Sequence, residues 1–289
     1  MPLTLPSFSY YAASLLFISA DAIQKKTSDG AFTWPYLAKR SFYTSLVSII
    51  ATIVIYGFST IPSLLIALQI VGCSLCCGLG LFFYIKAINN LNFSNVGSLE
   101  IIGNVLKQFS GVLLFHEKVG KFDMLSLALM SFGCIYQLVF TPSLRDAKYV
   151  LLSSFFWTIG YILLSYVLKS TPTVYWSVPI MEVTILLMSL ILTIFSKQRK
   201  ELTFKKDWNI KLKSNLFILI AVFIYLASLL NNYAFQQLPI TTINIYQLSM
   251  MPIGYVLSMK MFSERPTTIE VISFCTGFAG FALFIYVHN

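Results

Sequence analysis

The chain has 289 residues, of which 57% are hydrophobic and only 11% are charged. Soluble domains carry about 25% charged residues, so a chain this poor in charge cannot cover a water-facing surface and must expose much of its surface to lipid. The formal net charge of +9 does not indicate nucleic-acid binding, because most basic residues lie in short connections, where they can face anionic lipid headgroups.

The apolar runs predict helices that cross the bilayer. Lipid offers the backbone no hydrogen-bond partners, so only helices or closed barrels can span it. The runs lack the alternation of barrel strands, and a spanning helix needs about 20 such residues. In chain order, we expect ten helices at 8–24, 36–58, 63–88, 93–115, 122–141, 148–168, 173–196, 213–236, 240–262 and 268–287. The run at 8–24 is expected to be a retained helix, although Ala20-Asp21-Ala22 loosely resembles a signal-peptide cleavage site.

The second half of the chain repeats the first. A shift of 147 positions aligns, without a gap, Ala87 with Ala234, Glu117 with Glu264, and Gly133 with Gly280. For the earlier helices a shift of 142 aligns Arg40 with Glu182. Each half, 1–145 and 146–289, therefore holds five expected helices. Because an odd number of spans reverses the chain direction, we expect the halves to be inverted relative to each other, as in many secondary transporters.

Two Phe-x-Glu motifs, Phe115-His116-Glu117 and Phe262-Ser263-Glu264, each follow an apolar helix and precede a short turn and a final Gly-containing helix. We expect both Glu residues to fix these turns rather than to contact a substrate. Together with Arg40 at the start of the second helix and Leu99-Glu100-x-x-Gly103 in the fourth, this pattern resembles the drug/metabolite transporter superfamily of the EamA type over nearly the whole chain. The resemblance implies a ten-helix carrier for small metabolites, in a group whose substrates include amino acids, sugars, nucleotides and drugs.

Lys and Arg are distributed unevenly between the two sides. Fifteen lie in the odd-numbered connections and three in the even-numbered connections and termini. The positive-inside rule therefore places both termini outside, and we expect the membrane to be a bacterial plasma (inner) membrane. Many members of the superfamily carry the opposite bias, so this orientation departs from the common pattern.

Ionisable residues inside the membrane are functional candidates, because a charge there costs a few kcal/mol or more. In the fourth helix, Glu100, Asn104 and Lys107 share one face, and Gln108 flanks it. Glu100 and Lys107 are about 10.5 Å apart along the axis, too far for close pairing. Each therefore needs another partner, either a substrate that carries both charges or a polar residue on a neighbouring helix.

The ninth helix is the repeat partner of the fourth. Its residues Asn244, Tyr246 and Gln247 form a polar, aromatic cluster that we expect to meet the first cluster near the bilayer midplane, or else to hydrogen-bond between helices. Glu100 and Glu182 are the candidates for proton coupling, although Glu182 in the seventh helix is as well explained by a side chain that reaches the membrane surface or by pairing with another residue.

Other ionisable residues receive simpler interpretations. Arg40, near a helix start, is expected to anchor at the membrane surface. The five Cys lie in apolar runs, and His116 and His288 lie near helix ends. We therefore expect no catalytic residue, metal site or cofactor, and a membrane-embedded enzyme is disfavoured.

The sequence thus predicts an all-α integral membrane protein that works as a secondary transporter by alternating access. The expected cavity is lined by helices one, three, four, six, eight and nine, and the expected substrate is a small polar metabolite such as an amino acid or a related zwitterion or anion. Multidrug efflux is the alternative, because 25 Phe and 16 Tyr supply the apolar area that drug sites use. A non-transporting sensor or assembly subunit is the alternative of another class. A monomer would suffice for alternating access, and a homodimer is the other expected state.

Overall fold

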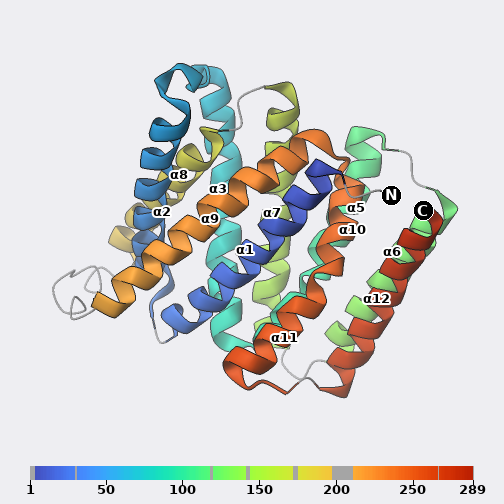
Figure 1. Cartoon of the computed structure of the whole chain (residues 1–289). Helices are drawn as coiled ribbons and strands as arrows, with labels where there is room; N and C mark the ends of the chain where they lie inside the picture. Colours follow the sequence, from blue (N-terminus) through green and yellow to red (C-terminus); the bar gives the residue numbers. More distant parts are fainter. Residues whose placement is uncertain are drawn as a thin grey trace.

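The computed structural model describes residues 4–29, 31–117, 120–140, 144–171, 175–196, 211–265 and 267–288. Within these ranges the chain is helical and contains no strand (Figure 1), which confirms the expected all-α class. The helices in chain order are α1 (Leu5–Ser28), α2 (Thr33–Tyr56), the 3-10 turn η1 (Phe58–Thr60), α3 (Leu64–Asn90), α4 (Phe93–Leu99), α5 (Ile101–Phe115), α6 (Lys121–Phe140), α7 (Leu144–Ser170), α8 (Ser177–Phe195), α9 (Lys211–Gln237), α10 (Ile240–Ser249), α11 (Met251–Phe262) and α12 (Thr268–His288).

Length and composition make several of these helices membrane spans. Among the described residues, α2, α3, α7, α8 and α9 are long and apolar enough to cross a bilayer, and α5, α6, α11 and α12 contain shorter apolar stretches. Large apolar side chains such as Val54 and Leu64, each 77% exposed, point away from the bundle. Soluble monomers rarely expose such surface over wide areas, so these side chains face lipid.

Two segments expected to be single helices are each broken into two. The segment 93–115 is interrupted at Glu100, between α4 and α5, and the segment 240–262 is interrupted at Met250, between α10 and α11. At each break a backbone hydrogen bond joins residues three apart instead of four apart. The N–H of Gly103 donates to the carbonyl of Glu100 at 2.9 Å, and the N–H of Ile253 donates to the carbonyl of Met250 at 3.1 Å. Pro252, which has no N–H to donate, contributes to the second break.

The helices pack in pairs drawn from the two halves of the chain. Figure 1 shows α1 running beside α9 and α6 beside α12, and the other close pairs are α3 with α7, α2 with α8, α5 with α10, and α4 with α11. Two buried apolar clusters result. One contains Leu37, Ile85, Phe93 and Ile220, and the other contains Ile70, Leu168 and Ile240. A cavity described below takes lining residues from both clusters.

Glycines allow α6 and α12 to approach closely. A Cβ on Gly133 would lie 2.6 Å from the carbonyl oxygen of Ser273, and a Cβ on Gly280 would lie 2.7 Å from that of Ser126. The hydroxyl of Ser126 also donates to the carbonyl of Gly280 at 2.5 Å. Small residues at such contacts are a general means of packing helices within membranes.

We expect Gly280→Ala to lower the stability of the protein by about 1–3 kcal/mol, because the added methyl group must push two backbones apart. Gly277→Ala on the same helix is the matched control, since no atom lies within 4 Å of its added Cβ. That change should leave stability equal or raise it by up to about 1 kcal/mol through helix propensity. Thermal unfolding of the detergent-purified variants measures both, and equal losses would contradict close packing at Gly280.

Candidate substrate cavity

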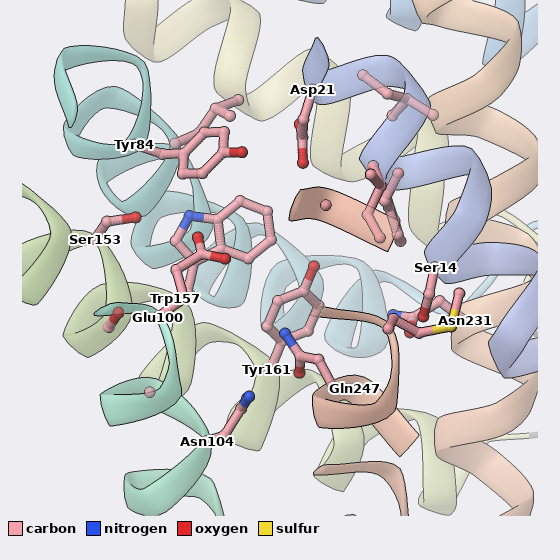
Figure 2. Close-up of a pocket in the computed structure, with 18 of the residues that line it drawn as sticks. Ser14, Asp21, Tyr84, Glu100, Asn104, Ser153, Trp157, Tyr161, Asn231 and Gln247 are labelled. Carbon is pink, nitrogen blue, oxygen red and sulfur yellow. The ribbon is translucent and has the colours of Figure 1, made fainter. Parts of the chain in front are cut away.

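A cavity of about 220 Å³ lies inside the bundle, and its mainly apolar walls carry several polar and charged side chains (Figure 2). Its walls come from α1, α3, α4, α5, α7, α9, α10 and α11, which correspond to the six expected lining helices, and from Arg40 on α2. Polar and charged lining residues are Ser14, Asp21, Gln24, Arg40, Glu100, Asn104, Lys107, Ser153, Ser154, Asn231 and Gln247. Aromatic lining residues are Tyr10, Phe17, Tyr84, Phe93, Trp157, Tyr161, Phe235 and Tyr255.

Lys107 is the cation at the centre of the expected site. It is 7% exposed, and its Nζ donates to Oδ1 of Asn104 at 3.3 Å and to Oε1 of Gln247 at 3.1 Å. The ammonium also lies 5.4 Å from the ring centroid of Tyr161, within cation–π range. The structure thus brings together residues of the fourth and ninth expected helices around one positive charge whose partners are all neutral.

Glu100 lies at the break between α4 and α5, where it lines the cavity. Within the described part of the chain, its carboxylate has no hydrogen-bond or ion-pair partner. Glu100 and Lys107 do not pair with each other, in agreement with their spacing along the helix. An unpaired anion and a cation held by neutral groups therefore share one cavity.

Asp21 is a cavity residue that the sequence reading missed. It lies on α1, lines the cavity, and accepts a hydrogen bond from Nε2 of Gln24 at 2.8 Å. Figure 2 shows Asp21 and Tyr84 on one side of the view and Asn104 and Gln247 on the other, with Trp157 and Tyr161 between them. An acidic residue inside an apolar helix indicates a functional site. The sequence Ala20-Asp21-Ala22 also resembles a cleavage site, and this resemblance drew attention away from the carboxylate.

The remaining predicted residues of the fourth and ninth helices lie outside the cavity lining. Gln108 is buried at 3% exposure, and Asn244 is buried at 2% exposure without a hydrogen-bond partner for its amide among the described residues. Tyr246 packs against the ring of Tyr11, with centroids 5.1 Å apart. Its hydroxyl lies 3.2 Å from the hydroxyl of Ser7. Gln247 is therefore the residue of the predicted ninth-helix cluster that reaches the cavity.

Arg40 and Glu182 form a buried ion pair, with Nη1 of Arg40 2.5 Å from Oε2 of Glu182. Both residues are 5% exposed. The expectation that Arg40 anchors at the membrane surface is wrong, because its side chain turns inward to meet α8 and lines the cavity. Its Nη1 also donates to the hydroxyl of Ser41 at 3.2 Å. Glu182 is therefore paired, which was one of the expected alternatives to proton coupling.

Apolar helices that surround a buried, charged cavity define an α-helical integral membrane protein of the transporter class. Residues 147–286 match the model of the EamA-like transporter family, which is part of the drug/metabolite transporter superfamily. The predicted resemblance is therefore confirmed.

Comparison with solved structures shows the fold. Matches were found to 28 chains. One of them, a crystal structure described only as that of a protein, has a TM-score of 0.71 and 12% sequence identity, and the match covers 98% of this chain and 96% of the other. At this identity the likeness concerns the fold alone. No curated protein matches the sequence.

Proposed function

We propose that this protein is a secondary carrier that moves a small zwitterion of the amino-acid class by alternating access. The observation that carries the proposal is that carboxylates and an ammonium line one cavity without neutralising each other. A substrate that carries both charges would supply the missing partners. Its ammonium group would bind near Asp21 and Glu100, and its carboxylate would bind Lys107 beside Asn104 and Gln247.

The ten-span inverted architecture is part of the proposal. Residues 1–145 and 146–289 would form the two five-helix halves. In the repeat alignment, α1 corresponds to α7, α2 to α8, and α3 to α9. The pair α1–α9 is then equivalent to the pair α7–α3, and α2–α9 is equivalent to α8–α3. All four pairs pack in the structure. The breaks at Glu100 and Met250 also fall in equivalent helices, and interrupted helices at the repeat interface mark binding sites in many transporters.

Cavity size favours a metabolite over a drug. Pockets for drug-sized ligands usually measure about 300–1,000 Å³, whereas this cavity measures about 220 Å³. Aromatic residues such as Trp157 and Tyr161 in the walls keep efflux of an organic cation as the alternative, since such rings bind cations through their faces. If transport is coupled to protons, Glu100 is a better candidate than Glu182 for the residue that binds the proton, because Glu182 is already paired with Arg40.

Counterflow in proteoliposomes tests the proposal. Vesicles preloaded with one amino acid are expected to accumulate the same labelled amino acid, and Asp21→Asn and Glu100→Gln should each weaken its binding by about tenfold or more, the cost of a lost hydrogen bond to a charged group. Glu270→Gln is the control, because Glu270 accepts a hydrogen bond from the Thr267 N–H at 2.6 Å within its own helix start. Exchange of organic cations but not of zwitterions would support the efflux alternative, and ligand binding without exchange would support a sensor.

A further inference from the structure

The two Phe-x-Glu motifs end their helices in the same unusual way. His116 and Ser263 adopt left-handed backbone conformations, with φ of 51° and 54°. The N–H of Glu117 then donates to the carbonyl of Gly111 at 3.1 Å, and the N–H of Glu264 donates to the carbonyl of Ser258 at 3.4 Å. These turns direct both carboxylates away from their own helices.

Each carboxylate binds the start of a helix in the other half of the chain. Glu117 accepts hydrogen bonds from the backbone N–H groups of Ile240 at 2.8 Å and Thr241 at 2.9 Å. Both oxygens of Glu264 accept from the N–H of Phe93, at 3.0 and 2.9 Å. The turn-fixing role expected for these residues therefore extends across the two halves, because each carboxylate caps a helix that it does not precede. Negative charge at a helix N-terminus is stabilising.

A lysine from a third helix completes each contact. Nζ of Lys25, near the end of α1, lies 2.6 Å from Oε1 of Glu264 and donates to the carbonyl of Leu91 at 3.1 Å. Nζ of Lys169, near the end of α7, lies 4.0 Å from Oε1 of Glu117. We call Lys25, Glu264 and Phe93 the Glu264 latch, and Lys169, Glu117 and Ile240 the Glu117 latch.

The two latches lie at opposite ends of the bundle. The segments α4–α5 and α10–α11 run side by side in opposite directions, so the start of one lies beside the end of the other. Phe93 of the Glu264 latch belongs to one buried apolar cluster, and Ile240 of the Glu117 latch belongs to the other. Each latch therefore contacts a different apolar cluster, at opposite ends of the bundle.

The two latches differ in the length of their ion pairs. The Glu264 ion pair is short at 2.6 Å, whereas the Glu117 pair, at 4.0 Å, is at the outer limit of a salt bridge. A carrier that exposes its cavity to one side at a time needs two separate closures, and the two latches are separate contacts at opposite ends of the bundle.

We infer that the Glu264 and Glu117 latches are the two gates of this carrier, each a carboxylate and lysine that tie three helix ends together at one face of the membrane. The inference rests on the proposed carrier function. Breaking the Glu264 latch should favour the conformation that is open on its face, and breaking the Glu117 latch should favour the opposite conformation.

Accessibility of a cysteine in the cavity tests the gates without any substrate. Ser14→Cys places a thiol at a lining position near the middle of α1, and a membrane-impermeant maleimide is applied to right-side-out and inside-out vesicles. Mass spectrometry of the Ser14→Cys peptide separates its labelling from that of the native cysteines. A tag added after residue 289, beyond the end of α12, identifies the Glu117 face in the same samples.

Glu264→Gln is expected to raise the labelling from the Glu264 face relative to the Glu117 face by about tenfold, and Glu117→Gln to shift the ratio the opposite way, because losing a charge-assisted hydrogen bond shifts a two-state equilibrium by about one decade or more. Lys25→Gln should shift the labelling ratio in the same direction as Glu264→Gln. It replaces Glu264→Gln in the test if that variant does not fold. Glu270→Gln, whose carboxylate caps its own helix, should leave the ratio unchanged.

Equal changes on both faces, or no change, would overturn the gate assignment. The outcome is separable from the proposed transport activity. Opposite shifts in a protein that exchanges no amino acid would overturn the substrate and keep the gates, whereas unshifted labelling in a protein that exchanges amino acids would overturn the gates alone.

Discussion

Lys107→Met is expected to weaken binding of a zwitterionic amino acid by about a hundredfold, or about 3 kcal/mol. Methionine has a similar length but no charge, so a bound carboxylate would lose its cationic partner in a buried site. Isothermal titration calorimetry of the detergent-purified protein gives the dissociation constant of the amino acid. The decisive comparison is between an amino acid and the amine that remains when its carboxylate is removed, because that amine does not need Lys107.

Selective loss of the amino acid, with affinity for the amine retained, would assign Lys107 to the carboxylate. Equal loss of both ligands would mean that Lys107 holds α5 against α10 through Gln247 and has no direct role in binding. Lys260→Met is the matched control. Its side chain is exposed on α11, so both affinities should stay at the parent values.

Glu182→Gln or Arg40→Leu is expected to destabilise the protein by about 3–5 kcal/mol, because each leaves one buried charge without its partner. The double variant Arg40→Met with Glu182→Leu should recover most of this loss, since a buried ion pair can often be replaced by apolar residues of similar size. Thermal unfolding in detergent measures all three variants.

A different result would revive proton coupling at Glu182. If Glu182→Gln unfolds at the parent temperature yet loses proton-driven uptake, then Glu182 moves protons and the ion pair contributes little to stability. If stability falls in both single variants and returns in the double variant, then Arg40 and Glu182 fasten α2 to α8.

Much of the architecture follows from local pattern. Apolar length predicts the helices, and helical spacing places Glu100, Asn104 and Lys107 on one face, all three of which line the cavity. The breaks at Glu100 and Met250 were not predicted, because the apolar pattern continues through both positions. A proline at 252 marks the second break, but proline alone does not distinguish a kinked helix from a straight one within a membrane.

The side-chain environment depends on packing that local pattern does not carry. Asn244 and Gln247 are three residues apart on α10, yet only Gln247 of the two lines the cavity, because the rotation of that helix is set by its contacts with α5 and α12. Arg40 was misassigned for the same reason. Its position near a helix start indicates the membrane surface, but its partner lies 142 residues away, at the position with which the repeat aligns it.

The pairing of Arg40 with Glu182 also bears on whether either half of the chain could associate with itself. Around a two-fold axis, a residue near the axis meets its own copy. An antiparallel dimer of the first half would therefore bury arginine against arginine at this point, and a dimer of the second half would bury glutamate against glutamate. Only the mixed pair is neutral, so in the proposed inverted arrangement this contact favours pairing of one half with the other, and a chain cut between them is expected to reassemble as a heterodimer and not as two homodimers.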